Sequence, residues 1–404
     1  MTSTRGKSGS SLALIFGIVF IDLVGFGIVI PVLPLYAERF GASPLVVGLL
    51  LGIYSAMQCL FAPILGKISD RVGRRPVLLV SLIGTSIGFL LMGFASSLPL
   101  LFLARIIDGA TGGNISTAQA YIADVTPPEK RSRGMGLIGA AFGLGFIFGP
   151  AIGGVLSHFS LAAPFFFAAA LAAVNALLVY LMLPESLTAE HKGQAHRQPS
   201  TLQILRESKG LSLQVVMGTY FFTTVAFSLL TATYPLFTER RFGYNAAQNG
   251  YIFACQGILS AIIQGGLLGW LLKVFSDKAL AVVGAAILTA SFFVLPMSAT
   301  ATMLFVATAG VAVGHGLVAA PLNGLASKGV DATSQGRVLG AMQSTASLAR
   351  IVGPVLGGYL LNRDAVGLGS TTFGRTPYWT GGAIMLFSIL LASMLKISNL
   401  ADGV

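Results

Sequence analysis

Charged side chains inside long apolar runs are the residues of this sequence that could do chemistry. Asp22 lies in the apolar run 12–36. If this run is a membrane-spanning helix, Asp22 lies about 15 Å deep, near the middle of a hydrocarbon core about 30 Å thick. A carboxylate at that depth is costly, and such residues usually serve function. We therefore expect Asp22 to take up and release protons, with a role in a structural hydrogen-bond network as the alternative.

Arg105 and Asp108 form a second candidate group in the apolar run 98–122. Three positions apart on a helix, they share one face, where a pair costs less than two isolated charges. The pair is either permanent and structural, or it opens. If it opens, Asp108 becomes a second proton carrier and Arg105 a partner for Asp22 or an anionic substrate group. Asn114 and Gln119 lie further along this run and are candidate substrate-binding residues.

The second half of the chain has two ionisable residues at a similar depth. His315 lies in the run 301–326 and Arg350 in the run 336–361. His315 is either a proton carrier or a hydrogen-bond donor in helix packing. Arg350 needs an anionic partner at that depth, so we predict that it binds substrate or pairs with one of the buried acids. The remaining candidate substrate-binding residues are Tyr36, Gln256, Asn323 and Gln343.

The elements that carry these residues are predicted from composition. Of the 404 residues, 54% are hydrophobic and 10% charged, whereas soluble domains have about 25% charged residues. Apolar runs of about 20 residues predict membrane-spanning helices. Twelve such runs are present, at 12–36, 44–65, 76–94, 98–122, 134–158, 162–183, 212–237, 246–272, 279–297, 301–326, 336–361 and 377–396.

The basic residues predict how these spans are oriented. The net charge is +11, but the Lys and Arg residues are distributed among the loops and do not form one patch, so nucleic acid is not an expected partner. With a cytoplasmic N-terminus, 18 of the 25 Lys and Arg residues fall on the cytoplasmic side and five on the other. This asymmetry places both termini in the cytoplasm. The two cysteines lie inside apolar runs, and no metal site is expected.

An internal repeat divides the chain into two halves. The motif GPxxGG at 149–154 returns at 353–358, which is 204 positions later. The motif at 34–39 returns at 235–240, which is 201 positions later. Because each half holds an even number of spans, the two repeats are parallel, and substrate sites in such folds lie between the halves near the midplane.

The predicted fold is an all-α polytopic membrane protein with twelve transmembrane helices in two parallel six-helix repeats. Its predicted parts are an N-terminal bundle at 1–183, a cytoplasmic linker at 184–210 and a C-terminal bundle at 211–404.

Several of these motifs resemble those of a known family. The loop GKISDRVGRR at 66–75 resembles the signature loop of the major facilitator superfamily, and the glycines of 145–154 are similar to the motif of its antiporters. Arg105 and the stretch DLVGFGIVIPVLP at 22–34 resemble its twelve-span drug/proton antiporters, most closely the tetracycline/proton branch. That branch has further acids in its third and ninth helices. The spans 76–94 and 279–297 have none, which argues against tetracycline itself as the substrate, and the resemblance implies multidrug or tetracycline-like efflux.

The resemblance also implies residues that control the change between inward-facing and outward-facing states. It implies that Asp70 caps the N-terminus of the helix 336–361 in the outward-facing state, where backbone donors favour an anion. Asp124 can then pair with Arg71 or Arg74. The basic residues of the loop could also serve only to fix topology. The predicted gating residues are Gly66, Asp70, Arg71, Gly73, Arg74, Asp124, Gly149, Pro150, Gly153 and Gly154.

The predicted function is secondary active transport. The leading hypothesis is a proton-coupled antiporter that exports a small lipophilic organic compound by alternating access. The alternatives are a proton symporter that imports a small metabolite, and a non-transporting membrane sensor or scaffold with the same fold. No nucleophile and base pair, phosphate loop or metal-ligand spacing indicates an enzyme. We expect a monomer in the inner membrane of a bacterium, surrounded by lipids and driven by the proton gradient without a cofactor.

Overall fold

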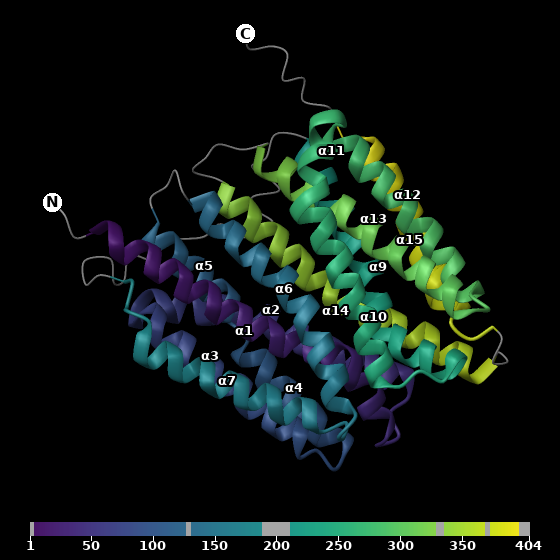
Figure 1. Ribbon diagram of the computed structural model, residues 1–404, viewed down its shortest axis with the longest axis horizontal. Helices are drawn as coiled ribbons and strands as arrows, with labels where there is room; N and C mark the ends of the chain where they lie inside the picture. The colour runs from purple at the N-terminus through teal and green to yellow at the C-terminus, as the bar shows by residue number, and fades with distance from the viewer. Residues whose placement is uncertain (1–3, 127–130, 188–210, 329–334, 368–371, 396–404) are drawn as a thin grey trace, which may run out of the picture. The chain divides into compact units, whose positions relative to one another are not determined.

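The computed structural model describes residues 4–126, 131–187, 211–328, 335–367 and 372–395 (Figure 1). These residues are almost entirely helical and include no β-strand. The helices before residue 187 are α1 (Thr4–Glu38), α2 (Pro44–Val72), α3 (Arg74–Gly93), α4 (Leu98–Thr111), α5 (Asn114–Val125), α6 (Arg131–Ser157) and α7 (Ala163–Met182). Those after residue 211 are α9 (Leu211–Phe242), α10 (Ala246–Ile262), α11 (Leu268–Val274), α12 (Asp277–Val294), α13 (Ala301–Lys328), α14 (Gln335–Gly367) and α15 (Arg375–Ser393).

Most predicted spans correspond to single helices of sufficient length. Among the described residues, nine helical segments are long and apolar enough to cross a membrane. One of them, Ala246–Val274, joins α10 and α11 through the π-helical turn Ile263–Leu267. The last two predicted spans, 336–361 and 377–396, correspond to α14 and α15.

The predicted span 98–122 differs, because two helices replace the one that was expected. α4 has 14 residues and ends at Thr111, whereas α5 has 12 residues and begins at Asn114. Each is shorter than the roughly 20 residues that a span needs, and only the two together reach that length. Gly112 and Gly113 separate them, and glycine is among the weakest helix formers. The prediction of one continuous helix was wrong, because an apolar run indicates length but not a local break.

The chain folds into two compact units. The first contains the described residues up to 187 together with 232–257, which form the end of α9 and most of α10. The second contains the other described residues from 211 onward. The predicted bundles, 1–183 and 211–404, stay a prediction. Most of the predicted linker, 184–210, lies outside the described residues.

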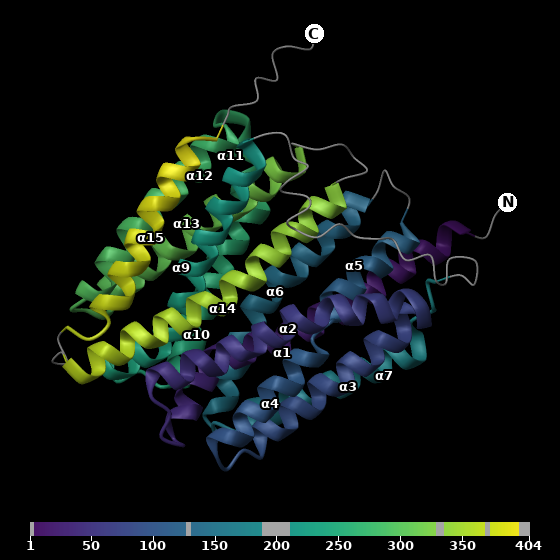
Figure 2. The same ribbon diagram turned by 180° about the vertical axis from the view of Figure 1, so that it is seen from behind.

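In the first unit, α1 packs along α6 and α7, and α3 packs against α4 and α7 (Figures 1 and 2). α2 packs against α4. The core between these helices includes the buried side chains of Leu23, Leu82, Tyr121 and Val179. α1 therefore contacts several helices of this unit, and a polar group in its middle is surrounded by protein.

In the second unit, α12 packs against α13 and α15. The start of α15 is fixed by Asp364 of α14, whose carboxylate accepts backbone N–H donors from Gly374 at 3.0 Å and Thr376 at 3.1 Å. Gly374 has a φ of +89°, a conformation that favours glycine. Asp364 is buried, and its hydrogen bonds satisfy donors that a helix start leaves unpaired.

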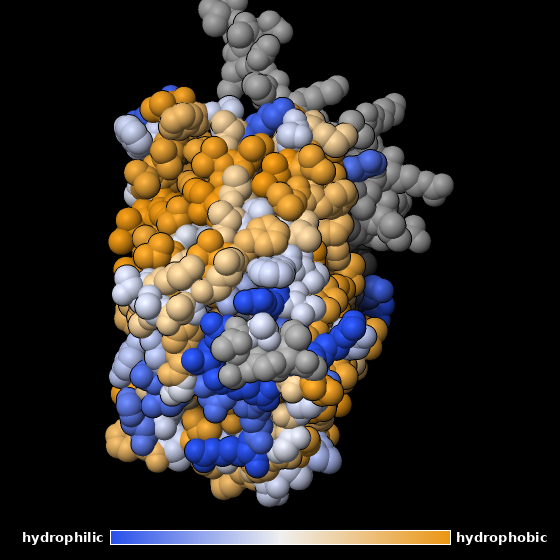
Figure 3. Space-filling view, turned by 90° about the vertical axis from the view of Figure 1, so that its right-hand side faces the viewer, coloured by the Kyte–Doolittle hydropathy of each residue, from blue (hydrophilic) through white to orange (hydrophobic). Residues whose placement is uncertain are grey.

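A broad part of the outer surface of the helices is apolar (Figure 3). Figure 3 shows hydrophobic side chains over a broad part of one face and hydrophilic ones gathered over another part. On α3, the exposed residues Val80, Ile83, Ile87 and Leu90 recur every three or four positions. Such a stripe belongs to one face of a helix, and lipid is the environment that suits it.

Candidate functional site

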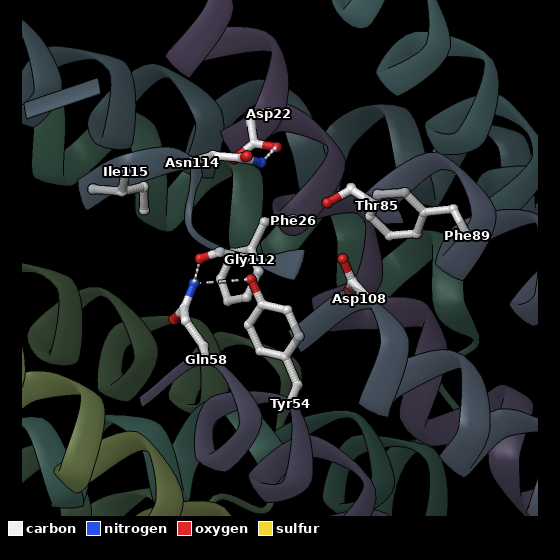
Figure 4. Close-up of a pocket in the computed structure, with 10 residues that line it drawn as sticks. All are labelled: Asp22, Phe26, Tyr54, Gln58, Thr85, Phe89, Asp108, Gly112, Asn114 and Ile115. Atoms are coloured by element: carbon white, nitrogen blue, oxygen red, sulfur yellow. Dashed lines mark hydrogen bonds between the residues drawn. The ribbon is translucent and has the colours of Figure 1, made fainter. Parts of the chain in front are cut away.

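A small pocket lies inside the first unit, where α4 gives way to α5 (Figure 4). Its lining residues come from α1, α2, α3, α4, α5 and the break between the last two: Asp22, Phe26, Tyr54, Gln58, Thr85, Phe89, Asp108, Gly112, Asn114 and Ile115. The free space is about 20 Å³, enough for about one water molecule. The pocket therefore suits a proton, a water molecule or a small ion.

Asp22 of α1 and Asn114 of α5 are joined directly in this pocket. The Asn114 side-chain Nδ2 donates a hydrogen bond of 2.8 Å to Asp22 Oδ1 (Figure 4). Asn114 is only 4% exposed, and its Oδ1 atom has no hydrogen-bond partner among the described residues. The helix break places Asn114 at the first turn of α5, so a movement of α5 would change the surroundings of Asp22.

Arg105 and Asp108 form a buried ion pair on α4. Arg105 Nη1 donates to Asp108 Oδ2 at 3.0 Å, and the two residues are 1% and 3% exposed. The guanidinium carbon of Arg105 lies 4.1 Å from the ring centroid of Tyr54, a cation–π contact. The Nε atom of Arg105 has no hydrogen-bond partner in the described part of the chain. Because this buried donor is unsatisfied, an ion pair with only a structural role would lower the stability of the fold.

Glycines let α4 approach its neighbours closely enough to bring Asp108 into the pocket. A Cβ atom on Gly88 of α3 would lie 2.8 Å from the Cβ of Asp108. One on Gly109 of α4 would lie 2.5 Å from the carbonyl oxygen of Tyr54 on α2. Both distances are shorter than real side chains adopt, so the helices meet backbone to backbone at these points.

The helix break itself is held by a side chain that sequence reasoning missed. Gln58 Nε2 donates to the carbonyl oxygen of Gly112 at 3.0 Å and to the hydroxyl of Tyr54 at 3.3 Å. Gln58 therefore supplies a donor to a carbonyl at the interruption. Tyr54, Gln58 and Thr85 are ordinary polar residues within apolar spans, and only their depth in those spans could have indicated them.

Two residues predicted to bind substrate on the first half lie elsewhere. Tyr36 is buried among Phe40 and Phe165, with ring centroids 5.1 Å away in both cases. Its hydroxyl donates to the carbonyl of Ala95 at 3.3 Å, so Tyr36 packs against the end of α3. Gln119 is half-buried on α5 and is not among the pocket-lining residues.

The predicted residues of the later helices are distributed over several elements. His315 of α13 stacks on Phe227 of α9, with ring centroids 4.0 Å apart and planes 21° from parallel. Arg350 of α14 donates to Ser347 at 3.2 Å and is partly buried. The remaining three are Asn323, which donates to the carbonyl of Ala319 within α13, the half-buried Gln343 on α14, and the buried Gln256 on α10.

The predicted gating loop, 66–75, consists of the last turns of α2, the single residue Gly73 and the start of α3, and its side chains form a polar cluster. Arg74 contacts Asp70, and its Nε donates to Asp124 Oδ2 at 3.0 Å. Ser69 Oγ accepts from Arg74 at 2.7 Å. Arg71 is exposed, and Gly66 accepts the hydroxyl of Ser69. Of the two arginines that the sequence offered to Asp124, the structure therefore pairs Arg74 with it.

Glu185 completes this cluster and was not predicted. Its Oε1 accepts the backbone N–H of Arg74 at 2.9 Å, and its Oε2 accepts that of Arg75 at 3.2 Å. These are donors at the start of α3, where an anion is favoured. Gly73, with a φ of +121°, has no space for a side chain, since a Cβ atom would lie 2.3 Å from Glu185 Oε2.

The glycines of α6 contact two other helices of the first unit. A Cβ atom on Gly149 would lie 2.6 Å from the Cα of Gly27 on α1, and one on Gly153 would lie 2.8 Å from the carbonyl of Ile28. One on Gly154 would lie 3.1 Å from the Cα of Gly250 on α10.

Pro150 lies within α6, beside these glycines. α6 thus packs closely on α1 through Gly149 and Gly153 and on α10 through Gly154.

The fold and the pocket together define a class: a polytopic helical membrane protein with an acidic site inside its helices. The sequence profile of the Major Facilitator Superfamily matches residues 15–354. The chain is 36% identical over 354 residues to the tetracycline resistance protein, class C, of Escherichia coli, a match that covers 87% of this chain and 89% of that protein. It is 29% identical to multidrug resistance protein 2 of Bacillus subtilis, with 94% and 93% covered.

Solved structures agree with this assignment. The crystal structure of a human organic anion transporter superimposes with a TM-score of 0.72 and 25% identity, covering 95% of this chain and 99% of that one. The nucleoside transporter NupG, at 13% identity, superimposes with a TM-score of 0.77 and covers 96% of this chain and all (100%) of that one; it supports the fold alone.

The chain therefore belongs to the Major Facilitator Superfamily. The predicted twelve-helix, two-repeat fold is confirmed, and the protein is an integral membrane transporter and not an enzyme.

Proposed function

We propose that this protein is a proton-coupled antiporter that exports a small lipophilic organic compound. The observation that carries the proposal is the pocket itself: two carboxylates, Asp22 and Asp108, line one buried space inside the membrane-spanning helices. Its matched relatives include tetracycline and multidrug resistance proteins, which favours export of a drug-like compound over the two alternatives from the sequence.

In the proposed cycle, Asp22 is the residue that carries the proton. It is held by one hydrogen bond from Asn114, which suits the charged form of the carboxylate. Protonation from the outer side neutralises Asp22 and weakens that bond, which favours release of substrate outward. Loss of the proton to the cytoplasm restores the charged form of Asp22, and in this state the protein binds a new substrate molecule at a separate place. Arg105 keeps Asp108 ionised while the pair is closed, so Asp108 takes part only if the pair opens.

The substrate needs a larger space than this pocket provides. A volume of about 20 Å³ excludes a drug-sized molecule. We assign substrate contacts to Arg350 and to the stacked His315 and Phe227, whose aromatic faces suit a planar lipophilic compound.

The polar cluster around Arg74 is the proposed cytoplasmic gate. It joins the α2–α3 loop to Asp124 on α5 and to Glu185 after α7. Because Arg74 holds α5 through Asp124, opening the cluster would free α5 to move. Movement of α5 carries Asn114, which links the gate to the proton site.

The setting of the transporter is part of the same proposal. The relatives from bacteria suggest the inner membrane, and the distribution of Lys and Arg favours a cytoplasmic side for both termini. The protein acts as a monomer in contact with lipid, and the proton gradient supplies its energy without a cofactor. Arg105, Asp108 and Asp22 are the charged groups that the gradient acts on.

The test uses purified protein in liposomes with a pH-sensitive dye inside. A panel of lipophilic cations, zwitterions and anions, with tetracycline included, is added with and without an imposed proton gradient. Proton movement opposite to the movement of one compound supports antiport and names the substrate class. Movement of both in the same direction supports symport, and no response to any compound supports a non-transporting role.

A further inference from the structure

The charges around the pocket do not balance. Asp22, Arg105 and Asp108 all lie in or beside this buried space, and Arg105 is bonded to Asp108. With both carboxylates ionised, the three groups carry a net charge of −1. A buried net charge is costly unless a counter-charge accompanies it. One proton on Asp22 removes the imbalance, and one monovalent cation would remove it equally well.

The pocket also offers the oxygen atoms that a hard cation requires. Asn114 Oδ1 is buried and has no hydrogen-bond partner among the described residues, and it belongs to the amide that bonds Asp22. Thr85, Asp108 and Gly112 line the same space. Carboxylate, amide, hydroxyl and backbone carbonyl oxygens are the ligands of hard cations.

The position and size of the site point to the same kind of ligand. In transporters, interrupted helices expose backbone carbonyls that hold coupling cations, and α4 is interrupted at Gly112 and Gly113. The free space of about 20 Å³ accommodates one water-sized particle. Within the described residues, no group of three or more His, Cys, Asp or Glu side chains could hold a metal ion, which disfavours a transition metal.

We propose that the pocket formed by Asp22, Asn114, Thr85, Asp108 and the helix break binds one sodium ion. Sodium and the proton occupy the same place in turn, each neutralising Asp22. This inference rests on the proposed function, because it adds a second coupling ion to the same proton site. Asn114 contributes an oxygen ligand as well as the hydrogen bond to Asp22.

The first experiment measures binding without transport. Thermal unfolding of the detergent-purified full chain is followed at pH 8 in sodium chloride and in choline chloride of equal ionic strength. The expected result is a midpoint at least about 2 °C higher in sodium, since a ligand that binds only the folded state stabilises it. Equal midpoints in the two salts would overturn the proposal.

Two variants locate the ion. Asp22→Asn removes the charge but keeps the shape, and it should abolish the sodium-dependent rise. Asn114→Ala removes the unpartnered oxygen, and it should raise the sodium concentration for half of the effect by about tenfold. Asn245→Ala changes an amide in an outer loop and should leave the effect unchanged. A full sodium effect in both Asp22→Asn and Asn114→Ala would place sodium elsewhere and overturn the proposal.

A transport experiment separates this inference from the proposed function. Liposomes receive a sodium gradient with equal pH on both sides, or a proton gradient with sodium absent, and efflux of the substrate found by the panel is measured. Efflux driven by either gradient supports both the sodium site and the proposed proton-coupled function. Efflux with the proton gradient alone overturns the sodium site and leaves the proposed function standing. Efflux with sodium alone supports the site and overturns proton coupling.

Discussion

Arg105 and Asp108 illustrate how a single charged residue depends on its partner inside a membrane. Arg105 is 1% exposed, has one carboxylate partner and lies against the ring of Tyr54. Removing one member of a buried ion pair leaves the other as an uncompensated charge, whereas removing both does not. The stability of the helix bundle therefore depends on the pair more than on either residue.

For this pair we predict that Arg105→Leu destabilises the protein strongly and that a second change restores part of the loss. The single change leaves Asp108 buried and unpaired, at a cost of about 3–5 kcal/mol. Arg105→Leu combined with Asp108→Leu should be more stable than Arg105→Leu alone. Thermal unfolding in detergent measures both, and a double variant no more stable than the single one would show that Asp108 has another counter-charge.

A glycine provides a second test at the level of residues. Gly88→Ala should lower stability and export together, because the new Cβ would lie 2.8 Å from the Cβ of Asp108 and would push α4 away from α3. A loss of about 1–3 kcal/mol is expected from such overpacking. Gly17→Ala on α1 is the matched control, since no atom lies within 4 Å of its Cβ position. Similar behaviour of the two variants would contradict this explanation.

Part of this site could be predicted from the sequence. Asp22, Arg105, Asp108 and Asn114 are polar residues deep in apolar runs, and three of them line the pocket together. Arg105 adjoins them through its bond to Asp108. Gln58 carries no comparable signal, because its role depends on a carbonyl of Gly112 that is exposed only by the helix break.

At the scale of elements, caps and breaks determine how the helices present their residues. α3 begins at Arg74, and its first donors are satisfied by the carboxylate of Glu185, 111 positions later in the chain. Sequence reasoning searches for a cap immediately before a helix, and it finds only Gly73 there. The partner comes from the end of α7, so only the folded chain brings it to the helix start.

Glu185→Ala should therefore destabilise the start of α3. The loss of its two hydrogen bonds to the backbone of α3 is expected to cost about 0.5–2 kcal/mol. Glu185→Gln keeps an oxygen acceptor and should lose less. The difference between the two variants is measured by thermal unfolding, and equal losses would mean that the negative charge and not the hydrogen bonds holds the helix start.

At the scale of the whole molecule, the repeat predicted the fold class but not every packing partner. The offsets of 201 and 204 residues identify two copies of a six-span unit. They do not reveal that residues 232–257 pack with the first compact unit. That contact depends on small residues meeting face to face, such as Gly154 of α6 and Gly250 of α10. Which glycine faces meet is set by three-dimensional packing, and the order of spans in the chain does not specify it.

Transport rate and substrate affinity should respond differently to a change in the cytoplasmic gate. Asp70→Asn removes one of the two negative partners of Arg74, so the cluster that holds the α2–α3 loop is weakened. We expect slower interconversion between states with little change in substrate binding. The comparison is between the rate of efflux from liposomes and the equilibrium affinity of the purified protein. An equal loss of affinity and rate would contradict the role of Asp70 as a gating residue.

The most direct test of the account is proton-coupled efflux by Asp22→Asn in liposomes with a pH-sensitive dye. Asn keeps the shape of the side chain but neither gains nor loses a proton, so it cannot complete the cycle. The account predicts that the variant folds, inserts into the membrane and shows no proton movement against substrate. Undiminished efflux of substrate by this variant, driven by the same pH gradient, would contradict the central role of Asp22.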